Sequence, residues 1–149
     1  MNIATRPILL VEDESNDIVL VQRAFARANI LNPLEIVRDG DEAVDYLGGT
    51  GSYGDRQQHP FPSIVLLDLK LPRRPGLDVL RWTRDRPGLK RMPIIILTSS
   101  RQNTEIDRAY ELGANSFLVK PVTFEDLLNL IKVLKAYWLT LNEYPAISP

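Results

Sequence analysis

Residues 63–68 read Ser-Ile-Val-Leu-Leu-Asp, a short run of mostly branched apolar residues that ends on an acid. Apolar and polar residues do not alternate in this run, which is typical of a strand buried on both faces of a parallel sheet. Residues 7–11 and 93–97 have the same character, and residues 34–37 and 116–119 are weaker examples. These five segments are the predicted strands.

Helical patterns fill the segments between the predicted strands. Apolar residues in segment 18–28 recur at steps of three and four, which places them on one face of a helix. Further helices are predicted from near Asp41, from Gly76 to Asp85, from a Thr104 N-cap to Gly113, and after a Thr123 N-cap. The strict alternation predicts an α/β fold, a doubly wound five-stranded parallel sheet with helices on both faces.

Composition excludes several classes of protein. The 149 residues suit one domain, and 44% hydrophobic with 25% charged residues is the balance of an ordinary globular chain. The net charge of -1 gives no basic field for nucleic acid or anionic lipid, and the lack of cysteine excludes disulfides. No apolar run is long enough to span a bilayer and no signal peptide is evident, so we expect a cytoplasmic protein with no nucleic-acid and no membrane partner.

The segment 48–62 interrupts the alternation of strands and helices. It contains four glycines and two prolines with few apolar residues, so we expect an exposed loop. It also holds the only histidine, His59, for which we expect no function because a single titratable group without partners makes no site.

Polar side chains follow most of the predicted strands. Ligands of open parallel sheets bind at the carboxyl ends of the strands, where these side chains would meet. Each residue alone fits a turn or a helix cap, but their joint placement favours a functional site. The group comprises Glu12, Asp13 and Glu14 after the first strand, Asp68 after the third, Thr98, Ser99 and Ser100 after the fourth, and Lys120 and Pro121 after the fifth.

This set of residue types fits phosphoryl transfer. Clustered carboxylates without histidine or cysteine favour an oxygen-loving ion such as Mg²⁺, which neutralises phosphate oxygens. A carboxylate can itself be the nucleophile and form an acyl phosphate, while a lysine and a hydroxyl bind the oxygens of the product. The sequence therefore predicts an acidic, Mg²⁺-binding site with one lysine at this edge of the sheet.

Four motifs at these strand ends resemble those of the receiver domains of two-component response regulators. The resemblance covers about residues 7–136, and it implies the flavodoxin-like strand order 2-1-3-4-5. The motifs are Leu10-Val11-Glu12-Asp13, Leu67-Asp68-Leu69-Lys70-Leu71-Pro72 with Gly76 beyond it, Leu97-Thr98-Ser99, and Phe117-Leu118-Val119-Lys120-Pro121.

The resemblance implies roles for the acidic residues. Asp68 matches the phosphoacceptor, and Asp13 matches a direct ligand of Mg²⁺. Glu12 occupies the adjoining acidic position, which often acts through water. The main-chain carbonyl of Lys70 falls where the family supplies a third protein ligand.

The resemblance also implies a switch. Thr98 matches the switch hydroxyl, Phe117 the aromatic switch residue, and Lys120 the lysine that contacts the phosphoryl group. Phosphate on Asp68 is expected to draw the Thr98 hydroxyl inward, so that Phe117 repacks. The peptide bond between Lys120 and Pro121 is expected to be cis, as it is in the family.

A finer resemblance is to the single-domain regulators that accompany bacterial and cyanobacterial phytochromes. It implies a histidine kinase partner, with a bacteriophytochrome as one candidate. Residues 1–138 would form the receiver domain, and residues 139–149 a C-terminal extension too short to be a DNA-binding domain. The similar segments are 48–62, 71–80, 114–117 and 136–138.

Two other functions stay open as alternatives to a phosphoacceptor signalling protein that is not otherwise an enzyme. A phosphatase of the haloacid dehalogenase type also forms an aspartyl phosphate, but it needs a second aspartate where this chain has Lys70. A flavodoxin-like FMN carrier needs a phosphate loop rich in hydroxyls and glycine after the first strand. The acids of segment 12–14 would repel a phosphate there.

The last predicted helix carries more apolar surface than packing on a sheet requires. One apolar stripe about 100° wide is enough for that packing. The surplus predicts a homodimer through the fifth helix and the C-terminal tail, and the alternative is a tail that folds back on its own domain. The first stripe is Leu127, Ile131, Leu134, Trp138 and Leu141, and the second is Leu130, Val133 and Tyr137.

Overall fold

The computed structural model describes residues 6–147, and in them the five predicted strands form one parallel sheet. The strand order is β2-β1-β3-β4-β5, as the resemblance implied. Thr98, expected after the fourth strand, is its last residue. The strands are β1 (Ile8–Val11), β2 (Leu34–Val37), β3 (Ile64–Leu67), β4 (Ile94–Thr98) and β5 (Ser116–Val119).

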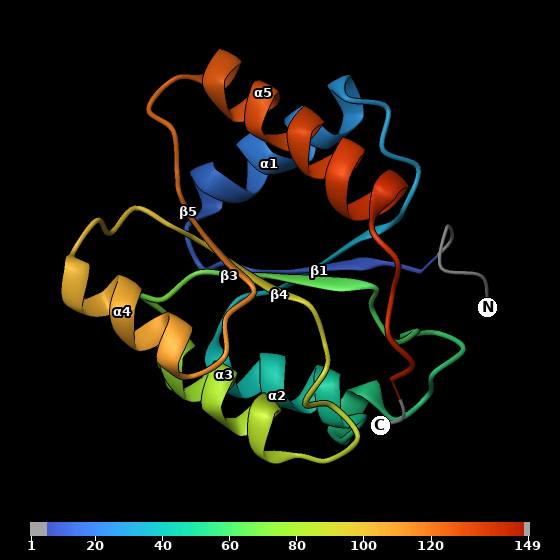
Figure 1. The fold of residues 1–149 in the computed structure, drawn as a ribbon. Coiled ribbons are helices and arrows are strands. Elements are labelled where there is room, and N and C mark those ends of the chain that lie inside the picture. Colours follow the sequence, from blue (N-terminus) through green and yellow to red (C-terminus); the bar gives the residue numbers. More distant parts are fainter. Residues whose placement is uncertain (1–5, 148–149) are drawn as a thin grey trace.

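Helices cover both faces of the sheet, which confirms the doubly wound α/β prediction (Figure 1). α1 and α5 lie on one face, and α2, α3 and α4 lie on the other. Two apolar cores result, one on each side of the sheet, and the three central strands β1, β3 and β4 are buried along their whole length. The helices are α1 (Ser15–Arg27), α2 (Gly40–Gly48), α3 (Gly76–Asp85), α4 (Asn103–Glu111) and α5 (Phe124–Leu134).

Local sequence explains where the helices begin. The side chain of Thr123 accepts a hydrogen bond from the backbone nitrogen of Asp126, which confirms the predicted cap of α5. The side chain of Asp39 caps α2 in the same way. The Thr104 prediction was wrong, because α4 starts at Asn103 and its N-cap residue, Gln102, makes no side-chain cap bond.

The segment 48–62 is less exposed than its composition predicted. It includes a short 3-10 turn, Gly51–Tyr53, and the side chains of Tyr53 and Phe61 pack against the core beside α2 and α3. The guanidinium of Arg56 donates hydrogen bonds to the carbonyls of Tyr46 and Leu47 at the end of α2. Aromatic and guanidinium groups therefore hold a segment that glycine and proline content alone identified as a free loop.

The chain beyond α5 continues as a π-helical segment, Lys135–Leu141, and then turns back across the domain. It passes beside the amino-terminal ends of the strands, far from their carboxyl ends (Figure 1). Tyr144 packs against the core under α1 and α5, and Ile147 packs against the core on the other face. The tail thus follows the alternative in which it folds back on its own domain. No helix in residues 6–147 is long and apolar enough to cross a membrane.

Candidate functional site

The polar residues predicted from the strand ends meet at one edge of the sheet. In the sheet register Val11 lies opposite Leu67, and Thr98 lies opposite Val119. The residues at and just after these positions therefore lie together at the carboxyl edge of the sheet. β1 supplies Glu12 and Asp13, β3 supplies Asp68, β4 ends on Thr98, and β5 supplies Lys120.

Three carboxylates form a candidate metal centre. Oxygen atoms of Glu12, Asp13 and Asp68 all lie within 4.8 Å of one another. Asp13 is exposed, while Glu12 and Asp68 are buried with residue exposures of 2% and 6%. Like charges at such spacing repel in a site of low dielectric, so the cluster needs cations. The donor set is all oxygen and half open to solvent, which fits a divalent ion such as Mg²⁺.

Lys120 supplies one cation to this cluster. Its Nζ lies 2.5 Å from Oε1 of Glu12, 2.9 Å from Oδ2 of Asp68 and 2.8 Å from Oδ2 of Asp17. An ammonium group has three donors, and these three carboxylates use all of them. The side chain of Lys120 is 14% exposed, so these are ion pairs of the interior rather than of the surface.

Burial and neighbouring charges shift the pKa values of Glu12 and Lys120. Burial raises the pKa of Glu12 to about 7, and repulsion from Asp68 adds to this, while the bond from Lys120 opposes it. Burial by itself would lower the pKa of Lys120, but bonds to Asp17, Asp68 and Glu12 raise it above its ordinary value. Lys120 is therefore a protonated ammonium group at neutral pH. The raised pKa of Glu12 means that this carboxyl gains or loses its proton close to neutral pH.

Backbone groups fix the orientation of the Asp68 carboxylate. Oδ1 accepts a hydrogen bond from the backbone nitrogen of Leu69 at 2.7 Å, and Oδ2 faces Lys120. α3 begins beside this turn, where Gly76 donates a bond to the carbonyl of Leu69. A Cβ at Gly76 would lie 2.2 Å from the backbone oxygen of Asp68. The glycine of the second motif is thus needed for α3 to approach the acid.

The hydroxyl of Thr98 lies beside the acidic cluster without a partner. Thr98 is fully buried, and its Oγ1 makes no hydrogen bond among the residues that the structure describes. A buried hydroxyl that lacks a partner costs roughly 1–3 kcal/mol. Such a cost is typical of functional positions, where a bond forms only in another state of the protein.

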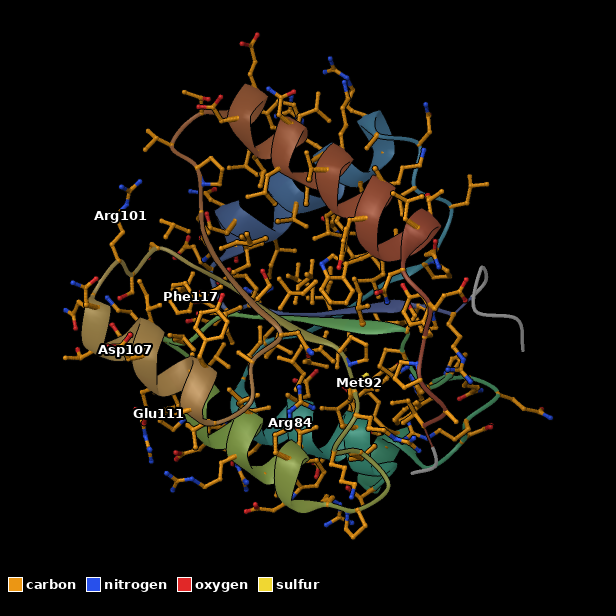
Figure 2. The ribbon with its side chains drawn as sticks, viewed as in Figure 1. Arg84, Met92, Arg101, Asp107, Glu111 and Phe117 are labelled. Atoms are coloured by element: carbon orange, nitrogen blue, oxygen red, sulfur yellow. The ribbon has the colours of Figure 1, made fainter. Side chains whose placement is uncertain are left out.

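Phe117 lies on the same face of the sheet as Thr98. Ile94 and Ile96 belong to the core under α2, α3 and α4, and Thr98 shares their face by alternation along β4. Phe117 packs against that core too, with its ring between β5 and α4 (Figure 2). Its backbone nitrogen donates a hydrogen bond to the hydroxyl of Tyr110 in α4 at 3.1 Å. This hydrogen bond therefore joins the backbone of β5 at Phe117 to the side chain of Tyr110 in α4.

One member of the cluster was not predicted from the sequence, and one prediction about the site was wrong. Asp17 was not singled out, because an acid in the first turn of a helix is common without any site. Lys120 and Pro121 were expected to share a cis peptide, but no cis peptide occurs in residues 6–147. Trans is the favoured isomer before proline by about 0.5–1 kcal/mol. The position of the carbonyl of Lys70 as a metal ligand stays a prediction.

Comparisons with known proteins agree with this geometry. The chain is 39% identical to the probable methanogenesis regulatory protein FilR2 of Methanothrix harundinacea, over 93% of this chain and 86% of that protein. It is 37% identical to the response regulator Rcp1 of Synechocystis, over 93% of this chain and 92% of Rcp1. The Mn²⁺-bound structure of Rcp1 superposes with a TM-score of 0.85 at 36% identity, over 95% of this chain and 99% of Rcp1.

A second solved structure is that of phosphorylated RcpA, a cyanobacterial phytochrome response regulator. Its TM-score is 0.88 at 34% identity, over 95% of this chain and 99% of RcpA. The sequence model of the response regulator receiver domain family matches residues 8–132 of this chain. These residues include every acid of the cluster, Thr98 and Lys120. With this match and a strand order of 2-1-3-4-5, the chain belongs to the response regulator receiver domain family.

Proposed function

We propose that this protein is a phosphoacceptor signalling protein, which takes a phosphoryl group from a histidine kinase onto Asp68. The observation that carries the proposal is the position of the Asp68 carboxylate. It is buried next to two further acids and to the Lys120 ammonium, with Oδ2 2.9 Å from Nζ. A phosphoryl group that comes from ATP through a kinase implies that the protein acts in the cytoplasm.

The proposed reaction is a transfer between two side chains. An oxygen of Asp68 attacks the phosphorus of a phosphohistidine, the new O–P bond forms and the N–P bond breaks. The electron pair of that bond stays on the imidazole nitrogen, which takes up a proton. Lys120 lies within hydrogen-bonding distance of the attacking carboxylate. Its ammonium group can therefore bind the phosphoryl oxygens without a large movement.

Mg²⁺ is the proposed ion of the acidic cluster. Glu12, Asp13 and Asp68 would hold it, with the main-chain carbonyl of Lys70 as a further ligand. When bound, the ion would neutralise charge on the transferring phosphoryl oxygens. The buried, closely spaced carboxylates support this proposal, as does the Mn²⁺-bound form of Rcp1.

The response to phosphate is proposed to pass through Thr98 and Phe117. Thr98 has a buried hydroxyl with no partner, and a phosphoryl oxygen on Asp68 would supply one. Movement of this hydroxyl would free space on the face where Phe117 packs. Such a switch biases an equilibrium between two states, by about 1–3 kcal/mol. Apart from accepting and losing its own phosphate, the protein would catalyse no reaction.

Transfer of label tests the proposal. The protein is incubated with Mg²⁺ and a small-molecule acyl phosphate, and the expected product carries acid-stable, base-labile phosphate. Asp68→Asn should carry none. Asp78→Asn is the matched control, because it removes one exposed carboxylate from the same edge of the sheet and should label normally. Equal labelling of the wild type and Asp68→Asn would exclude Asp68 as the acceptor.

The kinase partner is proposed to be a bacteriophytochrome. Rcp1 and RcpA support this, since RcpA is described as a phytochrome response regulator, whereas FilR2 is named for methanogenesis. Purified histidine kinases, a bacteriophytochrome among them, are compared for the initial rate of phosphotransfer to this protein. The phytochrome kinase should be the fastest donor. A faster donor of another class would contradict the proposal of a bacteriophytochrome partner.

A homodimer through the α5 face is the second part of the proposal. Leu127, Ile131 and Leu134 of the first apolar stripe are buried within the domain, but Val133 and Tyr137 of the second stripe are 68% and 55% exposed. These two exposed side chains help to line an apolar groove of about 480 Å³ between α5 and β5, together with Leu118, Leu130 and Trp138. A ridge next to a groove is self-complementary under a two-fold axis, so the proposed occupant is a second copy.

Light scattering tests the dimer. We expect the intact protein to be dimeric at tens of micromolar, and Val133→Asp to be monomeric. Val19→Asp is the matched control, because Val19 is an exposed valine of α1, on another helix, and its replacement should leave the dimer intact. A monomeric wild type, or a dimer that survives Val133→Asp, would contradict the proposed interface. The residues from 139 onward stay a proposed part of this interface, since Leu141 is 73% exposed although Tyr144 and Ile147 pack on the domain.

A further inference from the structure

Asp17 is a third acidic partner of Lys120 and lies outside the receiver motifs. It is the third residue of α1, and its Oδ2 lies 2.8 Å from the Nζ of Lys120. The side chain of Asp17 is 33% exposed, compared with 2% for Glu12 and 8% for Asp68. The ammonium therefore joins two buried acids of the candidate metal centre to one acid at its rim.

The fold explains why these two residues meet. Lys120 lies two positions after Leu118, which packs against the core under α1 and α5, so alternation directs both side chains to that face. α1 begins at the same edge of the sheet, and its first turn carries Asp17. The contact spans 103 positions of the chain, so it depends on the tertiary fold.

A divalent ion held by the three acids would compete with Lys120 for Glu12. In the structure Glu12 is paired with the ammonium at 2.5 Å, and the same carboxylate belongs to the three-acid cluster. An ion that takes Glu12 must leave the ammonium with other acceptors, since a buried charge that loses its partners is costly. Asp17 supplies such an acceptor at the rim, where it adds a negative charge close to the site without ligating the ion.

We infer that Asp17 is a positioning residue, which holds Lys120 against Asp68 and thereby lets a divalent ion take Glu12. The inference rests on the proposed function for the identity of Asp68 as acceptor. Without Asp17, Lys120 would pair more tightly with Glu12, and one favourable charge would be lost. Both effects weaken binding of the ion, and neither requires a change in the fold.

Calorimetric titration with Mg²⁺ alone, without a phosphodonor, tests the inference. Asp17→Asn should weaken Mg²⁺ binding about ten-fold, at the low end of the range found for groups that orient metal ligands. Asp17→Glu should restore much of the affinity, because it keeps the carboxylate. Asp78→Asn is the matched control, since Asp78 is the third residue of α3, exposed, and in no ion pair within residues 6–147. Wild-type affinity in Asp17→Asn would overturn the inference.

A second background separates positioning from a general effect of charge. In Lys120→Met there is no ammonium to position, so adding Asp17→Asn should weaken Mg²⁺ binding only through the lost charge, and by less than it does when Lys120 is present. An equal loss with and without Lys120 would overturn the inference. Thermal unfolding of each variant identifies any that fails to fold, and Asp17→Glu then serves as the variant compared between the two backgrounds.

Phosphorylation gives an independent comparison. In Asp17→Asn the Mg²⁺ concentration for half-maximal labelling should rise about as much as the dissociation constant does, while the rate at saturating Mg²⁺ changes less. A wild type that binds Mg²⁺ but takes no phosphate would contradict the proposed function and leave the calorimetric test of Asp17 unaffected. Labelling of the wild type with no shift in the Mg²⁺ requirement of Asp17→Asn would contradict the inference alone.

Discussion

The Nζ of Lys120 lies 2.9 Å from Oδ2 of Asp68, although β4 separates the strands that carry them. The lysine follows β5 and the aspartate follows β3, so the lysine side chain reaches past the end of β4. That end is Thr98, whose buried hydroxyl has no partner in residues 6–147. The strand order therefore brings an acid, a hydroxyl and an ammonium to one place from three different strands.

Replacing the hydroxyl of Thr98 should stabilise the protein. Thr98→Val keeps the branched shape and removes a buried polar group without a partner, so the free energy of unfolding should rise by roughly 1–2 kcal/mol. Urea unfolding of the protein without phosphate measures this. The control is Thr83→Val, because Thr83 is equally buried but its hydroxyl donates to the carbonyl of Val79 at 2.8 Å. The control should lose stability, and the same sign in both variants would contradict the account of Thr98.

The raised pKa of Glu12 predicts opposite pH trends with and without metal. Burial raises this pKa from 4.5 to about 7, so the folded state keeps a proton that the unfolded chain loses. Between these values the contribution of Glu12 to stability falls as pH rises, by at most about 1.4 kcal/mol per pH unit. Only the ionised carboxylate binds a cation, so Mg²⁺ affinity should instead rise with pH until Glu12 is ionised.

Calorimetry at about pH 6 and about pH 8 measures the Mg²⁺ affinity, and thermal unfolding without metal measures the stability, on the two sides of the Glu12 pKa. Glu12→Gln is the control, because its side chain cannot titrate. In this variant the Mg²⁺ affinity and the stability should each lose the part of their pH dependence that Glu12 contributes. Slopes that Glu12→Gln leaves unchanged would show that another group titrates.

Gly76→Ala should destabilise the protein and distort the site. The added Cβ would lie 2.2 Å from the carbonyl oxygen of Asp68, so α3 or the turn at the acid must move. We expect a loss of about 2–4 kcal/mol in the free energy of unfolding, with weaker Mg²⁺ binding. Gly54→Ala should be nearly neutral, since its φ is -68° and the nearest atom to a new Cβ is 3.6 Å away. Equal effects at both positions would contradict the packing argument.

Tyr110→Phe should loosen the contact between α4 and β5. It removes the acceptor of the Phe117 backbone nitrogen on an edge strand, at an expected cost of about 0.5–1 kcal/mol. Hydrogen exchange of the Phe117 amide should become several-fold faster. Tyr137→Phe is the control, because its exposed hydroxyl forms no hydrogen bond in the part of the chain that the structure describes. Unchanged exchange in Tyr110→Phe would show that this bond does not hold the strand.

The strands and most of the site were predictable because they depend on local patterns. Unbroken apolar runs identified β1, β3 and β4, and the polar residue after each run identified the edge where the site lies. The boundaries of α3 followed from Gly76 and the run of helix-compatible residues after it. These signals act over a few residues, so no knowledge of the tertiary fold was required.

The parts that escaped prediction depend on long-range contacts. Asp17 joins the site only because α1 packs beside β5, and nothing in the sequence near Asp17 indicates Lys120. Arg56 holds the segment 48–62 in place by donating hydrogen bonds to the backbone carbonyls at the end of α2. The glycines and prolines of the segment give no indication of this contact. The direction of the tail depends on the packing of Tyr144 and Ile147, which contact residues far away in the sequence.

The most direct test of the central claim is to identify the residue that becomes an acyl phosphate. The protein is treated with a small-molecule acyl phosphate and Mg²⁺, and then with borohydride, which reduces an aspartyl phosphate to homoserine. Peptide mass spectrometry then locates the change. The account predicts homoserine at position 68, absent when Mg²⁺ is chelated and absent in Asp68→Asn. Homoserine at Asp13 or another acid in the wild type, with none at position 68, would contradict it.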